Sequence, residues 1–515
     1  MMPQASPLRE PSNLIAGKWI PIPGQTIVST DPAHPDRIIW QGAASIDHVD
    51  AAVAAARAAH PAWARATMDE RAAVLRRYAR LCEARSEQIA SLITDETGKV
   101  LWETRGEAAS LSARVEQTLD KSPTAGLVRV AGYEIPLSGT RLGRCVFRSH
   151  GVMAIVAPFN FPAYLPNGQF VPAMLMGNTI VFKPSDKTPG VGQLLTELMH
   201  EALEAEGAPP GVFNLVQGGA DVSSSLSAHD DIDGILFTGS WPVGRRILEV
   251  NLDRPGRIIA LEMGGNNPAV VMPDADLKQA AVEIVRCAFN TTGQRCTCTR
   301  RAIIHERVAD RLIPLIVKCA STLVFADPKA DHPVFAGPVI SSQARQAVFD
   351  AQARFAQAGG RVLLQSSELP GRDGWFLTPA IIEVDRFTMS DPDDCGCDTE
   401  VFGPLLRISV VSDLDDAIEQ ANATRYGLTA SIFTRDPRQA ERFCLEARAG
   451  CINVNTGTAG ASPKLPIGGL GISGNHRPAG SFTLDCCAFP VAQQIESAEA
   501  PLIAEGMTFD DHWLS

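Results

Sequence analysis

Three side chains near the middle of the chain could together carry out chemistry on a carbonyl compound. Cys296 follows a glycine-containing turn at the end of an expected helix, where backbone amides can converge on a thiolate and on an oxyanion. Glu262 ends an apolar strand just before two glycines, so its carboxylate could serve as a general base for water. Asn160 lies in a strand-to-helix turn, where its amide suits an oxyanion hole.

Each of these residues also has a plainer interpretation. A lone cysteine is more often a buried core residue than a nucleophile, a strand-end glutamate is often a solvated charge, and a turn asparagine often hydrogen-bonds the backbone. A metal site built from the Cys296/Cys298 and Cys395/Cys397 pairs is disfavoured, because paired Cys-x-Cys without a nearby histidine is poor zinc spacing. We therefore expect no metal.

The elements that must position these residues alternate along the chain. Short apolar runs at 152–156, 179–182, 212–216 and 234–237 are separated by helical stretches, which is typical of a parallel sheet covered on both faces. A second alternating block follows residue 258, with strands expected at 269–272, 301–304, 405–411, 428–433 and 451–454. The pattern predicts a doubly wound α/β fold.

Helices and a ribbon are expected around these sheets. Helical periodicity runs from residue 46 to Pro61 and again over 69–97. The segments 128–148 and 482–494 are typical of antiparallel ribbon, and because neither has a core of its own, each needs a partner surface.

Composition excludes several classes of function. The 515 residues include 58 acidic and 46 basic side chains, and a net charge of −12 disfavours a protein that binds nucleic acid through its phosphates. No apolar run approaches the about 20 residues that a bilayer requires, and the first residues lack the apolar core of a secretory signal. The twelve scattered cysteines indicate reduced thiols, so we expect a cytoplasmic protein that binds neither nucleic acid nor membrane.

Six short motifs in this order together resemble the aldehyde dehydrogenase superfamily, and the resemblance covers nearly the whole chain. The motifs are Pro158-Phe-Asn-Phe-Pro162, Phe182-Lys-Pro-Ser185, Phe237-Thr-Gly-Ser240, Glu262-Met-Gly-Gly265, Gly293-Gln-Arg-Cys296 and Glu400-Val-Phe-Gly-Pro404. The resemblance implies that Cys296 is the nucleophile, that Glu262 is the general base, and that Asn160 forms the oxyanion hole with the Cys296 amide.

The resemblance also implies a nicotinamide cofactor and the residues that bind it. Those residues are Phe159, Lys183, Ser185, Asp186, Gly218, Gly219, Thr238, Gly239, Ser240, Gly244, Glu400 and Phe402. A carboxylate at Asp186 favours a free ribose 2′-hydroxyl and hence NAD, although the family often has the longer glutamate there, which leaves NADP as the alternative.

Further motifs resemble a subfamily that acts on N-succinylglutamate 5-semialdehyde in arginine breakdown. They are Pro166-Asn-Gly168, Met263-Gly-Gly-Asn-Asn-Pro268, Gly293-Gln-Arg-Cys-Thr-Cys298 and Ser473-Gly-Asn-His-Arg-Pro478. A dianionic substrate needs cationic or amide donors, and Arg295, His476 and Arg477 are the candidates. The alternatives are another carboxylated semialdehyde and, in a different class, a non-catalytic NAD-binding structural protein.

The resemblance divides the chain into three parts and a tail. Residues 1–125 and 151–260 are expected to form a dinucleotide-binding domain, and 261–478 a catalytic domain with a second parallel sheet. Residues 126–150 and 479–500 are expected to form an antiparallel oligomerisation ribbon, followed by a C-terminal tail over 501–515. The ribbon implies a homodimer or homotetramer.

Overall fold

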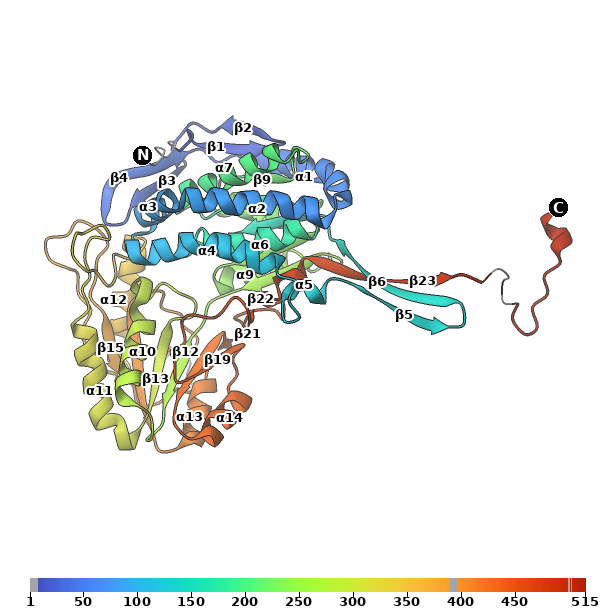
Figure 1. Ribbon diagram of the computed structural model, residues 1–515. Helices are drawn as coiled ribbons and strands as arrows, with labels where there is room; N and C mark the ends of the chain where they lie inside the picture. Colours follow the sequence, from blue (N-terminus) through green and yellow to red (C-terminus); the bar gives the residue numbers. More distant parts are fainter. Residues whose placement is uncertain (1–7, 390–395, 499–500, 502) are drawn as a thin grey trace.

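The computed structural model describes residues 8–389, 396–498, 501 and 503–515, and its centre is a pair of seven-stranded sheets (Figure 1). In the first sheet five strands run parallel, and an antiparallel pair extends one edge. In spatial order its strands are β11 (Ile258–Glu262), β10 (Gly234–Thr238), β7 (Val152–Val156), β8 (Thr179–Lys183), β9 (Phe213–Leu215), β1 (Ser12–Ile15) and β2 (Lys18–Pro21).

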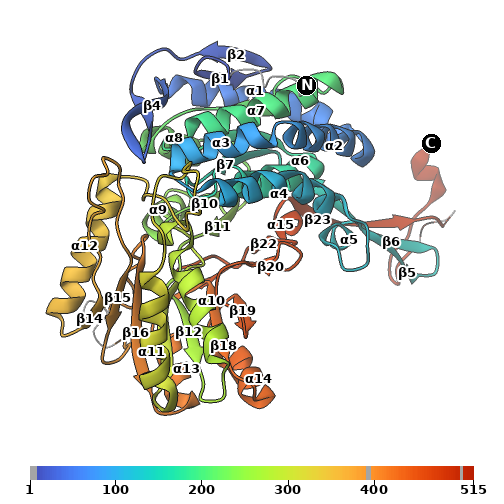
Figure 2. The ribbon, with the colours of Figure 1, turned by 60° about the vertical axis from the view of Figure 1, so that its left-hand side comes forward.

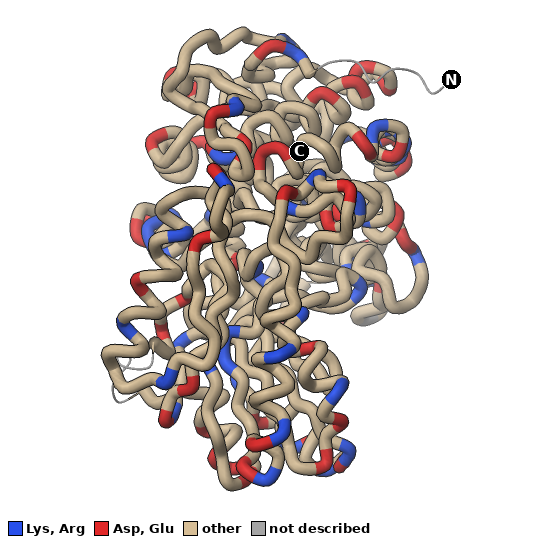
Figure 3. Tube along the Cα trace, turned by 90° about the vertical axis from the view of Figure 1, so that its left-hand side faces the viewer, with Lys and Arg blue, Asp and Glu red and all other residues tan. Residues whose placement is uncertain are grey.

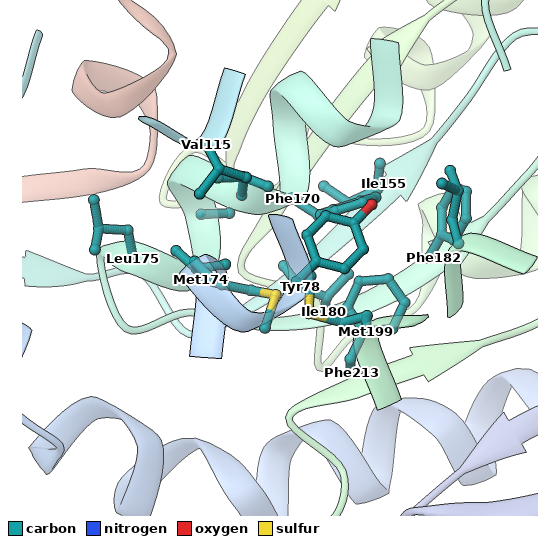
Figure 4. Packing of buried hydrophobic residues seen from close by; sticks show 14 of the residues in the cluster. Tyr78, Val115, Ile155, Phe170, Met174, Leu175, Ile180, Phe182, Met199 and Phe213 are labelled. Atoms are coloured by element: carbon teal, nitrogen blue, oxygen red, sulfur yellow. The ribbon is translucent and has the colours of Figure 1, made fainter. Parts of the chain in front are cut away.

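Helices cover both faces of this sheet, because its central strands are buried on both sides. These helices are α1 (Asp47–Arg65), α2 (Met68–Ala84), α3 (Ser86–Thr97), α4 (Leu101–Leu119), α6 (Tyr164–Leu175), α7 (Pro189–Ala205), α8 (Ala220–Ala228) and α9 (Trp241–Glu249). Between helices and sheet, the ring of Phe170 makes edge-to-face contacts with Tyr78, Phe182 and Phe213 (Figure 4). This packed layer fixes the helices that carry the site's loops.

The second sheet repeats the architecture with one antiparallel edge strand. Its order is β14 (Arg361–Leu364), β15 (Ala380–Glu383), β16 (Leu405–Val411), β13 (Thr299–His305), β12 (Asn267–Val271), β18 (Thr429–Phe433) and β19 (Cys451–Val454). Its helices are α10 (Leu277–Phe289), α11 (Glu306–Ser321), α12 (Ser342–Gln357), α13 (Leu414–Asn422) and α14 (Pro437–Glu446). The expected α/β fold with two doubly wound sheets is confirmed.

A three-stranded antiparallel ribbon projects from the body (Figure 2). Its middle strand, β6 (Arg141–Ser149), pairs with β5 (Tyr133–Ser138) and β23 (Ala488–Glu496). Short helices precede both halves, α5 (Gly126–Arg129) and α15 (Thr483–Cys486). Small pairings complete the fold: β3 (Ile27–Asp31) with β4 (His34–Gly42), β17 (Tyr426–Gly427) with β21 (Leu470–Gly471), and β20 (Pro466–Ile467) with β22 (Ala479–Gly480).

Four local expectations from the sequence were wrong. The first helix does not stop at Pro61 but continues to Arg65, because its buried stripe ends only at Trp63 and packing outweighs one lost backbone hydrogen bond. The helix expected over 69–97 is two helices, broken at Arg85. Residues 126–129 and 483–486 form helical turns rather than ribbon.

Charged residues of both signs are interspersed along the chain (Figure 3). Within the part of the chain that the structure describes, no helix combines the length and the apolar character that crossing a membrane requires. The described residues also include no cluster of three or more potential metal ligands. Of the four cysteines considered above as metal ligands, Cys395 lies outside the described residues.

Candidate active site

A cavity of about 840 Å³ opens at the carboxyl ends of β7, β8 and β10 and reaches the loop of the second sheet that contains Cys296. We call it the large cavity. Both Cys296 and Asn160 line it, so the structure brings together these two members of the predicted site. Most of the expected cofactor residues line it as well: Phe159, Lys183, Ser185, Asp186, Gly219, Thr238, Gly239, Ser240, Glu400 and Phe402.

The loop before Cys296 has an unusual backbone. Thr291 and Thr292 both have φ of 54°, and Gly293 has φ of 72°, so three successive residues adopt the left-handed conformation. A Cβ atom at Gly293 would lie 2.1 Å from the Gly403 carbonyl oxygen, which requires glycine there. Asn267 donates from Nδ2 to the carbonyl oxygens of Cys296 and Cys298, each at 2.8 Å, and thereby fixes the loop on its far side.

The two cysteines of this loop have different surroundings. Burial, together with the Glu400 and Glu262 carboxylates, raises the pKa of the Cys296 thiol to about 12, and the Arg300 guanidinium opposes this shift. Cys298 is completely buried and directs its sulfur toward the Asn290 carbonyl oxygen at 3.9 Å. Because only Cys296 lines the large cavity, it is the sulfur that a ligand can reach.

Asn160 lies next to the cysteine loop. Its Nδ2 donates to the Gln294 carbonyl oxygen at 3.0 Å, two residues before Cys296. The side chain is almost fully buried, at 5% exposure, and it lines the large cavity. An uncharged amide donor beside a thiol is the arrangement that stabilises an oxyanion formed by thiol addition.

Glu262 faces a second hollow. At the end of β11, its side chain lines a cavity of about 260 Å³ together with Gly450, Gly468, Gly469 and Gly474 and with residues 475–478. We call it the glycine cavity. Burial raises the pKa of the Glu262 carboxyl well above its usual range, and a hydrogen bond from the Ala479 amide opposes this shift. Glu262 thus lines the glycine cavity and Cys296 the large cavity, and the two groups are close enough for the Glu262 carboxylate to raise the pKa of the Cys296 thiol.

Glu400 and Phe402 close the large cavity beside Cys296. The Glu400 Oε1 accepts a hydrogen bond from the Gly265 amide at 3.1 Å, and a Cβ atom at Gly264 would lie 1.8 Å from the Glu400 Oε2. Burial raises the pKa of the Glu400 carboxyl to about 7. The Phe402 ring meets that of Phe159 edge to face, with centroids 6.0 Å apart.

The other end of the large cavity fits a dinucleotide. Lys183 Nζ donates to the Gly218 carbonyl oxygen at 3.0 Å, and burial lowers the pKa of this ammonium to about 8. Helix α9 begins at Ser240 without a side-chain cap, so its first amides are available to a phosphate. A Cβ atom at Gly219 would approach only the Asp221 carboxylate, at 3.5 Å, which leaves room for a ligand.

Two of the expected cofactor residues, Gly218 and Gly244, lie next to the large cavity without lining it. Gly218 supplies the carbonyl oxygen that contacts Lys183, but it does not line the cavity. Gly244 lies within α9, where a Cβ atom would be 2.3 Å from the Met263 sulfur, so its role is close helix packing.

The three residues proposed to bind substrate do not line the large cavity. Arg295 forms an ion pair with the buried Glu103 at 2.6 Å and lies over the Phe161 ring, 5.0 Å from its centroid. His476 and Arg477 line the glycine cavity together with Glu262. Both also line a third cavity, of about 500 Å³, at the base of the ribbon.

Sequence reasoning missed the residues that orient this machinery. Asn267, which fixes the Cys296 loop, occurs in a motif that was recognised but to which no role was given. Arg300 donates to the Gly403 and Arg295 carbonyl oxygens at 3.0 and 3.1 Å and carries positive charge beside Cys296. Lys99, Glu103 and Glu107 were missed as well. The sequence signal that could have indicated Glu103 and Glu107 is that both fall on the apolar stripe of the helix over Leu101–Leu119.

Comparisons with known proteins agree with this geometry. A family model described as the aldehyde dehydrogenase family matches residues 19–488. N-succinylglutamate 5-semialdehyde dehydrogenase 2 of Caulobacter vibrioides is 43% identical over 495 residues, which cover 95% of this chain and 97% of that protein.

Solved structures show the same architecture. The NAD-dependent aldehyde dehydrogenase from Sinorhizobium meliloti has a TM-score of 0.88 at 29% identity, covering 96% of this chain and 97% of that one. An NADP-dependent enzyme of E. coli has a TM-score of 0.87 at 30% identity, covering 95% and 98%. With a family match over most of its length and these neighbours, the chain belongs to the aldehyde dehydrogenase family, whose members use NAD or NADP.

Proposed function

We propose that this enzyme oxidises N-succinyl-L-glutamate 5-semialdehyde to N-succinyl-L-glutamate with NAD, as a step in arginine catabolism. The observation that carries the proposal is the relative of that name, which is 43% identical over 95% of this chain. The presence of both a cavity-lining Cys296 and the strand-end Glu262 supports a catalytic protein over a non-catalytic NAD-binding one.

In the first half of the proposed reaction, Cys296 forms the covalent bond to substrate. The thiol gives its proton to solvent, and the thiolate sulfur bonds to the aldehyde carbon while the carbonyl pair moves onto oxygen. Asn160 Nδ2 and the Cys296 amide donate hydrogen bonds to that oxyanion. A nicotinamide held beside Cys296 by Glu400 and Phe402 would supply the acceptor for the hydride that leaves the aldehyde carbon. The carbon–oxygen double bond then re-forms, which leaves a thioester on Cys296.

In the second half, Glu262 prepares water. Its raised pKa makes the carboxylate a stronger base than an exposed glutamate, so it can take a proton as the water oxygen bonds to the thioester carbon. The carbon–sulfur bond then breaks and releases the acid. Aldehyde, water and oxidised cofactor thus give acid, reduced cofactor and a proton.

NAD is proposed over NADP on the ground of Asp186. Its half-exposed carboxylate lines the large cavity close to Lys183 and Ser185, and it lies 3.9 Å from the Lys187 ammonium. A carboxylate there would accept a hydrogen bond from a ribose hydroxyl and would repel a 2′-phosphate.

The substrate assignment also has local support. A Cβ atom at Gly168 would lie 3.5 Å from the Arg114 guanidinium, so an arginine at this position, which a succinate semialdehyde enzyme would carry, would meet a like charge. Arg295, His476 and Arg477 remain the proposed partners of the two substrate carboxylates. Because Arg295 is already paired with Glu103, its positive charge is partly neutralised before a substrate arrives.

The remaining proposals concern assembly and location. We propose that residues 126–150 and 479–500 pair with a second copy, giving a homodimer or homotetramer, since both outer strands of the ribbon have an edge with no partner strand among the described residues. The domain division at 1–125, 151–260, 261–478 and 501–515 stands as a proposal too. Apart from Cys397, the described cysteines are free thiols, which supports a reducing cytoplasm.

A panel of aldehydes tests the function. N-succinylglutamate semialdehyde, succinate semialdehyde, glutamate semialdehyde and propanal are compared by kcat/KM, each with NAD and with NADP. The proposal predicts that kcat/KM for the succinylated substrate with NAD exceeds that for propanal by about 10⁴-fold, because a neutral aldehyde leaves the donors for two carboxylates without partners. Equal values would reject the substrate, and a preference for a different carboxylated semialdehyde would reassign it.

A further inference from the structure

Helix α4 contains two carboxylates that the proposed reaction does not use. Glu103 and Glu107 lie one turn apart on the buried face of the helix, and their side chains are 2% and 0% exposed. Burying a carboxylate is costly unless it is paired and hydrogen-bonded. Both are paired, and each also accepts hydrogen bonds from one of the two loops that form the site.

Glu107 binds the start of helix α6. Its Oε1 accepts hydrogen bonds from the amides of Ala163 and Tyr164 at 3.0 and 3.1 Å, while α6 has no side-chain cap of its own. A carboxylate at a helix N-terminus satisfies free amides and complements the helix dipole. Glu107 therefore caps α6 from a neighbouring helix, immediately after the Asn160 turn.

Lys99 completes this side of the arrangement. Its Nζ donates to Glu107 Oε2 at 2.6 Å and to the Asn160 carbonyl oxygen at 3.1 Å. The same ammonium lies 3.7 Å from the centroid of the Phe161 ring. The Lys99–Glu107 pair thus contacts the Asn160 turn at its first residue, at its aromatic ring and at its last two amides.

Glu103 makes the corresponding contacts with the cysteine loop. Its Oε1 accepts from Thr291 Oγ1 at 2.9 Å and from the Arg295 guanidinium at 2.6 Å. Arg295 Nε in turn donates to Thr291 Oγ1 at 2.7 Å. Because Thr291 has a left-handed backbone and Arg295 directly precedes Cys296, Glu103 stabilises a strained loop at the nucleophile.

We propose that Glu103 and Glu107 are positioning residues that set the placement of the Asn160 amide relative to Cys296. The Lys99–Glu107 pair would orient the oxyanion donor, and the Glu103–Arg295 pair would orient the nucleophile, both from a single rigid helix. This inference rests on the proposed oxyanion role of Asn160. It gives Arg295 a role in the enzyme's own scaffold, in addition to the substrate contact proposed above.

The test separates the two pairs by using two reactions of Cys296. Oxidation of the aldehyde needs an oxyanion donor, whereas alkylation by iodoacetamide needs only the thiolate. The Lys99→Met/Glu107→Gln double variant removes both charges together, so no unpaired charge remains. We expect its kcat for oxidation to fall about 10²-fold, the cost of losing one oxyanion donor, with alkylation within about twofold of the parent enzyme.

A second variant addresses the other pair, and a third serves as control. Glu103→Gln is expected to slow oxidation and alkylation together, because it disturbs the nucleophile loop itself. Arg71→Met is the matched control, since Arg71 Nε donates to the Leu175 carbonyl oxygen at 2.7 Å and so caps the far end of the same helix α6. Loss of this cap is expected to lower the Tm without changing either rate.

Asn160→Ala separates the inference from the proposed function. If Asn160→Ala leaves oxidation unchanged, the oxyanion role is wrong. If Asn160→Ala slows oxidation, adding Lys99→Met and Glu107→Gln to that variant should lower kcat by less than about a further threefold. The reason is that all three changes then act on the same group, the Asn160 amide.

The inference would be overturned if the losses in kcat from Asn160→Ala and from the double variant were fully additive. It would also be overturned if the double variant oxidised the aldehyde at the parent rate, or if Arg71→Met lost oxidation while keeping alkylation. Lys99→Arg serves if the double variant does not fold, because it keeps both charges while the larger guanidinium displaces the Asn160 carbonyl. The same split between the two rates is then expected, and equal effects on both would again overturn the inference.

Discussion

The large cavity and the glycine cavity differ in size, in lining and in the reacting group that each contains. The large cavity, about 840 Å³, is lined by strand ends of the first sheet and contains Cys296. The glycine cavity, about 260 Å³, is lined by loops after the second sheet and contains Glu262. We infer that acylation and deacylation depend on different walls of the enzyme and can be separated by mutation.

Removing the nucleophile should have the largest effect. In Cys296→Ala the described lining of the large cavity contains no thiol, so kcat for aldehyde oxidation should fall by at least about 10⁴-fold, as when a covalent nucleophile is removed from other enzymes. The affinity for NAD, measured by fluorescence titration, should remain close to that of the parent enzyme.

Cys298→Ala is the matched control, because Cys298 is equally close in sequence but fully buried. It should keep most of the activity. If Cys296→Ala kept its turnover, or if only Cys298→Ala lost it, Cys296 would not be the nucleophile.

Removing the base should affect only the second step. In Glu262→Gln we expect a rapid burst of about one equivalent of NADH, followed by turnover reduced about 10²- to 10⁴-fold, the usual contribution of a general base. In the parent enzyme the raised pKa of Glu262 means that the basic form increases with pH, so deacylation should speed up as pH rises through that pKa. Stopped-flow absorbance measures both phases. A missing burst would place Glu262 in the activation of Cys296.

Changes at the rim of the glycine cavity should affect substrate binding more than chemistry. Arg477→Ala and His476→Ala are expected to raise KM for the succinylated dianion about tenfold or more, and to leave KM for propanal nearly unchanged, because a lost charged hydrogen bond costs about 1.5–3 kcal/mol. Steady-state kinetics with both substrates checks this. If both KM values stay constant, the dianion does not contact these residues.

The smallest expected effect concerns the charge beside Cys296. Because the Glu400 carboxylate raises the pKa of the thiol, Glu400→Gln should speed alkylation of Cys296 by iodoacetamide about two- to fivefold at pH 8.5. The pKa of Glu400 itself is about 7, so at pH 6 the carboxyl is already mostly neutral and the two proteins should react alike. A difference that persists at pH 6 would point to altered access rather than to charge.

The sequence predicted most of the parallel strands and of the large cavity's lining, because buried parallel strands are continuous apolar runs and their ends carry the motifs. It did not predict β14 and β15 of the second sheet. Nor did it predict the glycine cavity around Glu262, since this depends on how the loops after β19 fold over the end of β11. Contacts such as Glu103 with Arg295 join residues 192 positions apart and have no local pattern. Helix boundaries at Pro61 and Arg85 were decided by tertiary packing, which overrides local propensity.

The most direct test of the separated steps is the mass of the Glu262→Gln protein after it is mixed with N-succinylglutamate semialdehyde and NAD. The account predicts one covalent adduct per subunit, equal to the aldehyde less two hydrogens, located on the peptide that contains Cys296, and absent when NAD is left out. No adduct, or an adduct on a different residue, would contradict a thioester formed on Cys296 and released by Glu262.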